Sequence, residues 1–575
     1  MSVAFSENAL TVLRERYLRR DEGGQLVEDA TGMLRRVATA VAAPARDFGE
    51  DRTFWEERFF ERLGRLEFLP NSPTLMNAGL PDGQLAACFV LPVQDDLDSI
   101  FTALSRMVRI HQTGGGTGFS FSALRPRQDR VQSTGGISSG PLSFMHLFDH
   151  TTAVIRAGGR RRGANMAVLR VDHPDIEEFV NAKHTPGQLE NFNLSVGVTD
   201  EFFAALDAST PFPLRNPRRA RVARTVDPAA LFDGIVDAAW ATGDPGLLFL
   251  DEINRHNPTP SLGVIEATNP CGEQPLLPCE SCVLGSINLG KFAAGNGLDW
   301  RRLGAAIRDA VVFLDNVIEV SRYPFTEIET ATRRTRKIGL GVMGLADLLA
   351  EVGVAYDSDE ALGLAGRIAE FLTQQARAAS AELGEWRGAF PAFRESIWPR
   401  HGLTTLRNAT VTCVAPTGTI SLLAGASGGI EPFFALAIAR RVLDGRRLIE
   451  VNPMLLAALG AGDKAVLTAI RERGSVRHLE MLPAALRRRF AVALEIAPEF
   501  HVRMQAAFQA HVDAAVSKTV NLAPEAPVTA VRDVCRLARQ LHLKGATVYR
   551  YGSRPGQTLS LVDERARHDC RECAV

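Results

Sequence analysis

Five consecutive residues, Asn269-Pro270-Cys271-Gly272-Glu273, place an amide, a thiol and a carboxylate at alternate positions. Alternate side chains of an extended segment point to the same side, and Pro270 favours extended backbone at Asn269. Gly272 permits a tight turn or the close approach of another group. We therefore expect one short loop to present these three reactive groups to one small molecule.

Further thiols lie elsewhere in the chain. Cys279 and Cys282 follow the loop closely, and Cys570 and Cys573 stand near the C-terminus. The spacing of Cys570 and Cys573 suits reversible disulfide exchange, and neighbouring basic residues favour the thiolate. A zinc site shared with Cys279 and Cys282 is the alternative. A redox pair on a polar tail is useful only if it reaches another site.

Cys88 lies in a short apolar run, Leu85–Val90, which is typical of a buried strand. A single cysteine in such a strand is usually a small core residue. The same interpretation applies to Cys413 and to Cys535, which lies in a helical stretch. The loop and Cys282 make Cys88 a candidate partner in thiol chemistry as well.

Two glycine-rich segments are candidate anion sites. Gly114–Ser120 offers bare backbone amides, and Pro416–Ser421 follows a strand-like run and precedes a helical one. Free amides and hydroxyls at a helix start bind anions. A tight turn followed by an N-cap explains either segment equally well, and neither contains the Gly-Lys-Ser/Thr of a nucleotide-hydrolase phosphate loop.

Other patterns have competing interpretations. Gly339–Gly344 fits the dinucleotide fingerprint, but the preceding residues 333–337 are mostly charged rather than a buried strand. His146 and His150 have helical metal spacing, although structural or surface roles explain them as well, and we predict no metal ligands. Arg160–Arg162 stand in a glycine-bounded loop that is either solvated or phosphate-binding.

Composition narrows the function classes. The 575 residues are 46% hydrophobic and 23% charged, with a net charge of −1 and eight cysteines. This balance gives no electrostatic reason to expect nucleic acid or an acidic membrane as a partner. No apolar run reaches the ~18 residues that span a bilayer, and no signal-peptide core is present. We expect a cytoplasmic protein, in which few cysteines form disulfides.

The pattern of apolar residues changes along the chain. Residues 1–67 show helical periodicity, and residues from 68 onward alternate short apolar runs with loops and helical stretches. That alternation predicts a large α/β domain. Residues 451–508 again read as mainly helical, and the last fifteen are polar, as in a mobile tail.

Taken together, these segments resemble the catalytic chain of ribonucleotide reductase, in particular its adenosylcobalamin-dependent class. The likeness covers nearly the whole chain in family order. It is carried by residues 69–79, 87–90, 114–122, 161–166, 269–273, 282–289, 336–345, 416–421, 517–522 and 544–550.

The resemblance implies a fold and a division of the chain. The fold is an α/β, ten-stranded barrel of two parallel half-barrels with a central finger loop, preceded by a small helical region. The implied division is a helical region at 1–67, the barrel at 68–555 and a flexible redox tail at 556–575.

The resemblance also implies catalytic roles. Cys271 would carry a thiyl radical that abstracts the 3′ hydrogen of the ribose, Glu273 would act as base on the 3′-hydroxyl, and Asn269 would bind the sugar hydroxyls. Cys88 and Cys282 would protonate the departing 2′-hydroxyl and supply two electrons, ending as a disulfide. Cys570 and Cys573 would reduce that disulfide, and thioredoxin or glutaredoxin would recharge the tail.

Binding roles follow in the same way. Arg160, Arg161 and Arg162 fall where the family reads deoxynucleotide effectors, and the resemblance leaves monomer or homodimer open. The substrate would contact Ser72, Ala87, Cys88, Gly116, Asn269, Pro270, Cys271, Gly272, Glu273, Pro416, Thr417, Gly418, Thr419 and Ile420.

The radical source is assigned by exclusion. The iron-dependent class uses two adjacent tyrosines, whereas Arg550 separates Tyr549 and Tyr551 here, and the glycyl-radical class needs a C-terminal glycine motif that this chain lacks. Adenosylcobalamin remains as the expected cofactor. A metal-radical-dependent large subunit, a nicotinamide oxidoreductase and a nucleotide- or zinc-binding protein without turnover are the alternatives. Cys279 stands where the family usually has tyrosine, and it is either inert or a competitor for Cys88.

Overall fold

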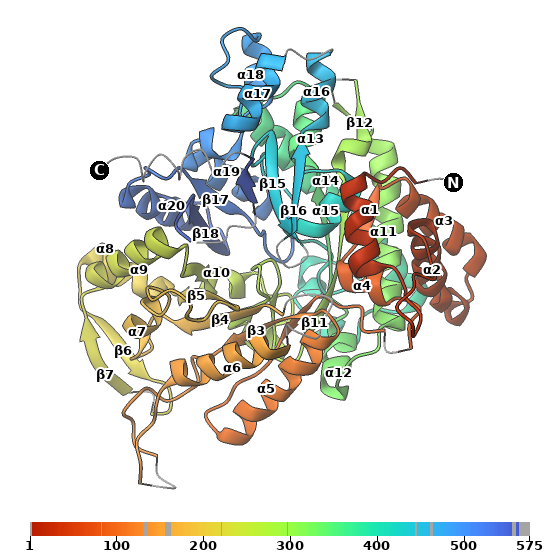
Figure 1. Ribbon diagram of the computed structural model, residues 1–575. Helices are drawn as coiled ribbons and strands as arrows, with labels where there is room; N and C mark the ends of the chain where they lie inside the picture. Colours follow the sequence, from red (N-terminus) through yellow and green to blue (C-terminus); the bar gives the residue numbers. More distant parts are fainter. Residues whose placement is uncertain are drawn as a thin grey trace.

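The computed structural model describes residues 3–81, 83–131, 135–155, 163–219, 221–295, 297–442, 446–460, 464–554 and 559–562. A mixed sheet of ten strands forms its centre, with helices around it (Figure 1). The strands are β1 (Phe68–Pro70), β2 (Cys88–Val90), β3 (Gly116–Ser120), β4 (Asn165–Arg170), β5 (Phe192–Val198), β8 (Gly246–Phe249), β11 (Ser281–Asn288), β14 (Ile338–Met343), β17 (Thr519–Leu522) and β18 (Gly545–Arg550).

The sheet contains three sets of parallel strands. The order is β1-β11-β2-β3-β4-β5-β8-β18-β17, and β14 pairs with β11. Strands β2, β3, β4, β5 and β8 run parallel, as do β11 with β14 and β17 with β18. Two antiparallel pairings, β11 with β2 and β8 with β18, join these sets. The expected α/β class is confirmed.

Two predictions about local structure are wrong. The glycine-rich segment 114–120 was expected to be a loop, but its residues from Gly116 onward form β3, because the missing side chains let another part of the chain approach. The strand-like run that precedes Pro416, residues 411–415, was expected to be a strand, but it makes only isolated parallel bridges, Leu340 to Thr412 and Val414 to Val516.

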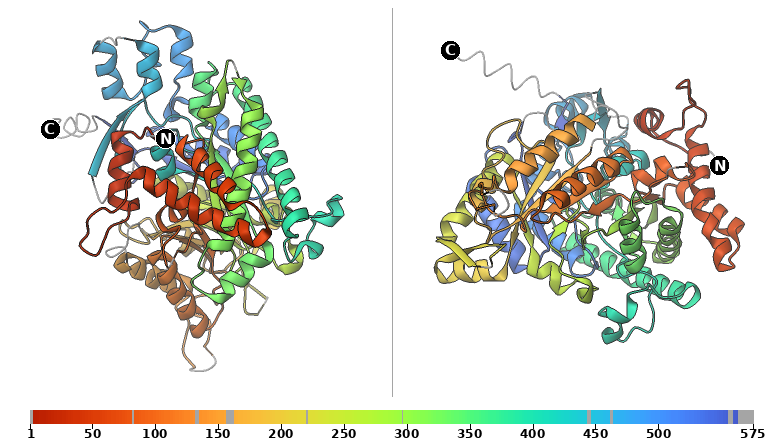
Figure 2. Two further views of the ribbon diagram at one scale, coloured as in Figure 1. Left: turned by 90° about the vertical axis from the view of Figure 1, so that its right-hand side faces the viewer. Right: turned by 90° about the horizontal axis from the view of Figure 1, so that it is seen from below.

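The N-terminal region is helical, as predicted. It consists of α1 (Glu7–Val12), a π-helical turn at Leu13–Tyr17, α2 (Ala30–Ala42) and α3 (Arg52–Gly64). Asp29 and Asp51 cap α2 and α3 by accepting hydrogen bonds from first-turn amides. These helices pack beside α11 (Trp300–Val320) on one flank of the sheet (Figures 1 and 2).

The remaining helices surround the sheet, and Figure 2 shows α11 beside the long helix α14 (Asp359–Arg387). They are α4 (Ser72–Asn77), α5 (Leu97–Gln112), α6 (Pro141–Ile155), α7 (Ile176–Val180), α8 (Asp200–Ala208), α9 (Pro228–Thr242), α10 (Leu250–Arg255), α12 (Thr326–Thr335), α13 (Leu345–Glu351), α15 (Gly418–Ala424), α16 (Pro453–Leu459), α17 (Lys464–Arg473), α18 (Ala484–Arg489), α19 (Pro498–Gln509) and α20 (Val528–Gln540). Helices α16 to α19 confirm the predicted helical character of residues 451–508.

Smaller strand pairs complete the fold. They are β6 (Phe212–Asn216) with β7 (Arg221–Val226), β9 (Ala267–Thr268) with β10 (Pro275–Leu276), β12 (Ala293–Ala294) with β13 (Gly297–Leu298), and β15 (Ala437–Val442) with β16 (Arg446–Val451) and β19 (Leu559–Leu561). No helix within the described ranges is long and apolar enough to cross a membrane.

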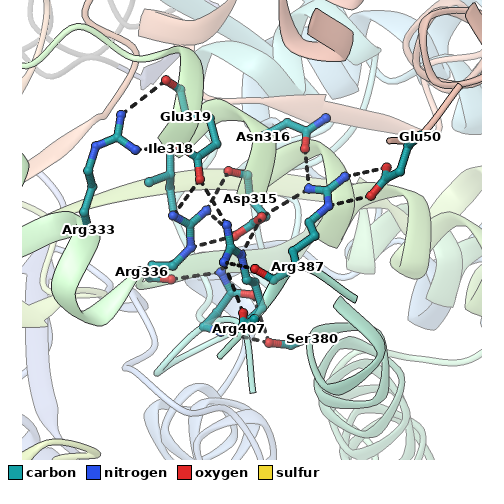
Figure 3. A network of polar contacts seen from close by, with 12 residues as sticks. Glu50, Asp315, Asn316, Ile318, Glu319, Arg333, Arg336, Ser380, Arg387 and Arg407 are labelled. Carbon is teal, nitrogen blue, oxygen red and sulfur yellow. Dashed lines mark hydrogen bonds and ion pairs between the residues drawn. The ribbon is translucent and has the colours of Figure 1, made fainter. Parts of the chain in front are cut away.

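A buried polar network ties the helices to the sheet (Figure 3). The carboxylate of Asp315 on α11 forms ion pairs with Arg336, Arg387 and Arg407, and its side chain is fully buried. Arg387 also pairs with Glu50, which precedes α3. Although burial raises the pKa of the Asp315 carboxyl, the three arginines outweigh that effect and hold it below its usual value.

Candidate active site

The Asn269–Glu273 segment forms the tip of the hairpin of β9 and β10. The Gly272 amide donates to the Asn269 carbonyl at 3.1 Å, and the Asn269 amide donates to the Gln274 carbonyl at 3.3 Å. Gly272 has a φ of 85°, which favours glycine. The expectation of an extended segment is therefore wrong, because the hydrogen bonds close a tight turn that leaves Cys271 exposed while Asn269 and Glu273 are buried.

Two glycines of β3 allow this hairpin to lie against the sheet. A Cβ at Gly118 would come within 1.8 Å of the Thr268 carbonyl oxygen, and one at Gly116 within 2.9 Å of the Pro270 ring. The Asn193 side chain on β5 donates to the Pro270 carbonyl at 2.7 Å. The glycine run that resembled an anion loop thus seats the hairpin.

The seated turn brings its polar groups to Cys88. The Asn269 Nδ2 lies 3.1 Å from the Cys88 Sγ, and that Sγ lies 4.0 Å from the Glu273 Oε1. The Asn269 Oδ1 accepts from the Gln274 amide at 3.0 Å, which fixes the orientation of the amide group. Three residues expected to share a site from the sequence are therefore in contact.

Cys88 and Cys282 lie opposite each other as Cα partners in the antiparallel pairing of β2 and β11. Directly opposite residues place their Cβ atoms about 4.5–5.5 Å apart, which is close to the range that a disulfide bridges. Neither is in a disulfide here. Burial raises the pKa of both thiols well above the usual value, and the Glu273 carboxylate adds to this effect, so both remain protonated.

Cys271 faces a large cavity. This cavity of about 1060 Å³ is lined by Pro270, Cys271 and Gly272 from the turn and by Pro416 from the second glycine-containing segment. Strands β4, β5, β8 and β18 and residues 183–190 and 516–519 form other parts of its wall. A small molecule in this cavity could therefore reach the exposed Cys271 thiol. The buried thiols Cys88 and Cys282 lie next to the turn that carries Cys271.

The other predicted binding residues surround this centre. Gly116 is the Cα partner of Cys88 and donates its amide to the Ala87 carbonyl at 2.8 Å. Thr417 caps α15 with a φ of 55°, and its hydroxyl accepts from the Gly429 amide; Gly418, Thr419 and Ile420 form the first turn of α15. That helix packs on β1, after which Ser72 begins α4 and accepts from the Tyr17 hydroxyl.

The sequence comparisons match this architecture. The protein-family model described as "Ribonucleotide reductase, barrel domain" matches residues 86–405 and 399–549. The model described as "Ribonucleotide reductase, all-alpha domain" matches residues 3–83. The chain belongs to the ribonucleotide reductase family. The resemblance found in the sequence is thereby confirmed.

This reductase is also similar to individual proteins along nearly its whole length. A vitamin B12-dependent ribonucleoside-diphosphate reductase of Mycobacterium tuberculosis is 55% identical over 96% of this chain and 80% of its own length. One from Thermoplasma acidophilum is 44% identical over the same shares. The class Id ribonucleotide reductase alpha subunit of Actinobacillus ureae superposes with a TM-score of 0.78 at 25% identity, covering 95% of this chain and 97% of that one.

Cys279 lies apart from the thiol pair of the reductase. It has a φ of 66° and donates its amide to the Val90 carbonyl. Its side chain packs against the larger outer core, whereas Cys88 and Cys282 belong to an inner apolar cluster. Burial raises the pKa of its thiol, with the nearby Arg106 working against this. Of the two expectations for Cys279, the geometry favours the inert one.

The dinucleotide fingerprint has a packing role in the reductase. Gly339 and Gly341 lie inside β14 rather than in a turn between a strand and a helix. A Cβ at Gly341 would come within 2.4 Å of the Cys413 carbonyl oxygen, and one at Gly339 within 2.7 Å of its sulfur. Gly341 therefore admits a neighbouring backbone and Gly339 admits neighbouring side chains, and the nicotinamide alternative loses its structural context.

Two other sequence features do not contribute to the described site. His150 on α6 contacts the His146 carbonyl through Nδ1, and no cluster of three potential metal ligands occurs in the described part of the chain. Arg160–Arg162 and the pair Cys570 and Cys573 lie outside the described residues.

Sequence reasoning missed several residues of the reductase site. Asn193 and Gln274 hold the turn through hydrogen bonds, yet neither belongs to a recognisable motif. The core assignment of Cys413 is confirmed, since it lies buried in the inner cluster beside β14. The close glycine spacing of β3 and β14 was the one available signal, since it marks strands that another backbone approaches.

Proposed function

We propose that this chain is the catalytic chain of a vitamin B12-dependent reductase that converts ribonucleoside diphosphates to 2′-deoxyribonucleotides with adenosylcobalamin. The observation that carries the proposal is the placement of the exposed Cys271 thiol on a turn whose neighbours contact Cys88, with Cys282 directly opposite. The two relatives at 55% and 44% identity bear the cofactor and the diphosphate substrate in their names.

The exposed position of Cys271 fits an external radical source. Its side chain lines a cavity of about 1060 Å³ whose walls include residues 183–188 and 545–549. When bound, adenosylcobalamin supplies one-electron chemistry. The residues that line this cavity would hold the cofactor, and Cys271 is the cysteine among them.

The chain's residues then divide the work on the ribose. Cys271, as a thiyl radical, abstracts the 3′ hydrogen, while the Glu273 carboxylate takes the proton of the 3′-hydroxyl. The Asn269 amide, fixed by the Gln274 amide, binds the sugar hydroxyls. Loss of the 2′-hydroxyl is then easier because the adjacent carbon carries the radical.

The buried thiols supply the proton and the electrons. Because burial and the Glu273 carboxylate raise the pKa of Cys88, that thiol is protonated and can donate its proton to the departing 2′-hydroxyl, which leaves as water. Cys88 and Cys282 together give two electrons and become a disulfide. Their opposite positions on β2 and β11 require little movement for the bond to form.

The finer features of the resemblance are part of this proposal. We place substrate phosphates at Pro416–Ile420, deoxynucleotide effectors at Arg160–Arg162, and re-reduction at Cys570 and Cys573 with a thioredoxin-type partner. The bridges at Thr412 and Val414 link β14 to the segment before β17 and support closure of the sheet into a barrel. The division at 1–67, 68–555 and 556–575, the monomer or homodimer state and the cytoplasmic location also remain proposals.

An assay of the purified chain separates the proposal from its alternative. Deoxyribonucleotide formation from diphosphates should require adenosylcobalamin and a dithiol, and no second subunit. Activity without cobalamin that appears only on adding a metal-loaded partner would instead assign the chain to the metal-radical-dependent class. Comparing diphosphates with triphosphates in the same assay tests the substrate.

A further inference from the structure

A tyrosine of the N-terminal helical region is buried rather than exposed on the surface. Tyr17 ends the π-helical turn Leu13–Tyr17, and it is 2% exposed. The Leu18 amide closes this turn by donating to the Leu13 carbonyl at 3.0 Å. π-Helical turns are rare and frequently occur at functional sites. Because a buried tyrosine hydroxyl usually has a hydrogen-bond partner, the partner of Tyr17 indicates what the turn is for.

The Tyr17 hydroxyl donates to the hydroxyl of Ser72. The two oxygens are 2.8 Å apart, and Ser72 is 9% exposed. A serine hydroxyl has two lone pairs that accept and one hydrogen that it donates. The bond from Tyr17 uses a lone pair, so the Ser72 hydrogen remains available, and no acceptor for it occurs in the described part of the chain. A hydroxyl that accepts one hydrogen bond also donates a stronger one.

Ser72 lies close to the thiol pair. The Asn71 amide donates to the Leu284 carbonyl at 2.8 Å, and the Ala87 amide donates to the Cys282 carbonyl at 3.2 Å. Carbonyls of residues two apart in a strand point to the same edge and are about 7 Å from each other. Strand β1 therefore ends where β2 begins along one edge of β11, and Ser72 leaves the sheet at the gap between these two strands.

Asn71 supplies a second unused donor at the same place. Its Oδ1 accepts from the Thr74 amide at 2.9 Å and from the Thr74 hydroxyl at 3.1 Å. Its Nδ2 is buried and has no hydrogen-bond partner among the described residues. Buried donors are normally satisfied. Free donors on the adjacent residues Asn71 and Ser72 therefore indicate a ligand with several acceptor oxygens, such as a phosphate.

The helices around Tyr17 also contact the segment that we propose binds phosphates. Helix α1 packs against α15, whose first turn contains Gly418–Ile420 (Figure 1). The π-helical turn packs against α4, which begins at Ser72, and α15 packs against β1. Residues 7–17 thus contact both elements that carry the proposed phosphate ligands.

We propose that Tyr17 is a positioning residue that directs the Ser72 hydroxyl toward a phosphate oxygen of the nucleoside diphosphate, so that the N-terminal helical region is part of the substrate site. The proposal rests on the proposed function, which supplies the diphosphate. Tyr17 does not touch the substrate itself. Without its hydroxyl, Ser72 can turn its hydrogen to other acceptors, and its bond to the phosphate becomes weaker.

The test is a double-mutant cycle on the binding of cytidine diphosphate, measured by calorimetry. Tyr17→Phe removes one oxygen atom and should weaken binding roughly threefold to tenfold, which is the usual contribution of one hydrogen bond. Ser72→Ala should weaken binding at least as much. In the Ser72→Ala background, Tyr17→Phe should have no further effect, because the hydroxyl that it orients is gone.

Tyr323→Phe is the matched control. The Tyr323 hydroxyl donates to the Ile318 carbonyl at 3.3 Å, in the connection that follows α11, so its loss should leave the affinity for cytidine diphosphate unchanged. Native affinity in Tyr17→Phe would overturn the proposal. The same loss of affinity from Tyr17→Phe with and without the Ser72 hydroxyl would also overturn it, since that result would show a general structural effect. Circular dichroism checks that each variant is folded.

Steady-state kinetics provide a second readout. Tyr17→Phe should raise the KM for cytidine diphosphate and leave kcat within about twofold of the native value, because it removes binding and not chemistry. A fall in kcat at unchanged KM would contradict the role of Tyr17. The binding cycle needs no turnover, so a native chain that binds cytidine diphosphate but forms no deoxynucleotide would count against the proposed function alone. A native chain that does not bind cytidine diphosphate would refute both.

Discussion

Cys88 and Cys282 stand directly opposite each other on β2 and β11, although 193 intervening residues separate them in the sequence. Asn269 and Glu273 approach the same Cys88 sulfur from the hairpin turn that carries Cys271. The sheet therefore holds a thiol pair that can become a disulfide without rearrangement of its strands.

The thiol pair predicts a specific product of turnover. A Cys570→Ser, Cys573→Ser variant that is fully reduced, freed of reductant and given one equivalent of substrate with adenosylcobalamin should end with a Cys88–Cys282 disulfide, because the tail thiols proposed to reduce it are absent. Cys282→Ser should prevent that disulfide and lose sustained turnover, because one of the two electrons can no longer come from the pair. Peptide mapping after alkylation checks both.

Cys279→Ser is the matched control for this experiment, since its side chain packs with the outer core. It should leave both the disulfide and the rate unchanged. A turnover-dependent disulfide between Cys279 and Cys88 would contradict the assignment of the pair.

The seating of the hairpin predicts a severe effect of Gly118→Ala. The added Cβ would meet the Thr268 carbonyl oxygen at 1.8 Å, so the hairpin must move or the strand must distort. We expect deoxynucleotide formation to fall strongly and the free energy of unfolding to drop by about 1–3 kcal/mol. Urea unfolding and the activity assay measure the two effects.

Gly234→Ala provides the comparison, because a Cβ there meets nothing within 4 Å on helix α9. Its stability should stay equal or rise slightly, as alanine restricts the unfolded chain. Native activity and stability in Gly118→Ala would show that the hairpin does not lie against β3.

The Asp315 network predicts a large loss of stability in Asp315→Asn. Three arginines would lose the charge that compensates them in a fully buried place. Breaking a buried pair costs about 3–5 kcal/mol, which urea unfolding can measure. Glu382→Gln removes an exposed ion pair with Arg308 and should change stability by about 1 kcal/mol or less. Similar losses in the two variants would be evidence against the network.

The same carboxylate predicts acid sensitivity. Burial raises the pKa of Asp315 but Arg336, Arg407 and Arg387 lower it more, so the folded pKa lies below the unfolded one. The unfolded state then binds more protons, and the stabilisation is full above the unfolded pKa of about 3.9 and is lost as pH falls through the folded value. The stability difference between native chain and Asp315→Asn should therefore shrink from pH 6 to pH 3. A difference that is constant over this range would contradict the depressed pKa.

Local patterns predicted much of this site, and contacts between distant segments account for the rest. The alternation of short apolar runs with helical stretches from residue 68 onward was sufficient for the α/β class, and the order of the motifs was sufficient for the reductase family. The extended geometry at Asn269–Glu273 was wrong because the Gly272 and Asn269 amides close a turn. The roles of Gly116 and Gly118 were unpredictable from spacing, since the backbone that needs their missing side chains lies about 150 residues away.

The burial of Glu280 and Lys337 was also unpredictable from the sequence. Each is an ordinary charged residue in the sequence, and only the folded chain buries them as a pair beside Cys282. Cys279 is the opposite case, because its place near Cys282 in the sequence made it a candidate competitor for Cys88, whereas its side chain packs with a different hydrophobic cluster from Cys88 and Cys282.

The most direct test of the central claim is the Cys271→Ala variant assayed with a ribonucleoside diphosphate, adenosylcobalamin and a dithiol. The claim predicts that deoxynucleotide formation disappears while nucleotide binding, measured by calorimetry, is retained, because the exposed thiol does the chemistry without holding the fold. Deoxynucleotide formation by Cys271→Ala at a rate near that of the native chain would contradict it.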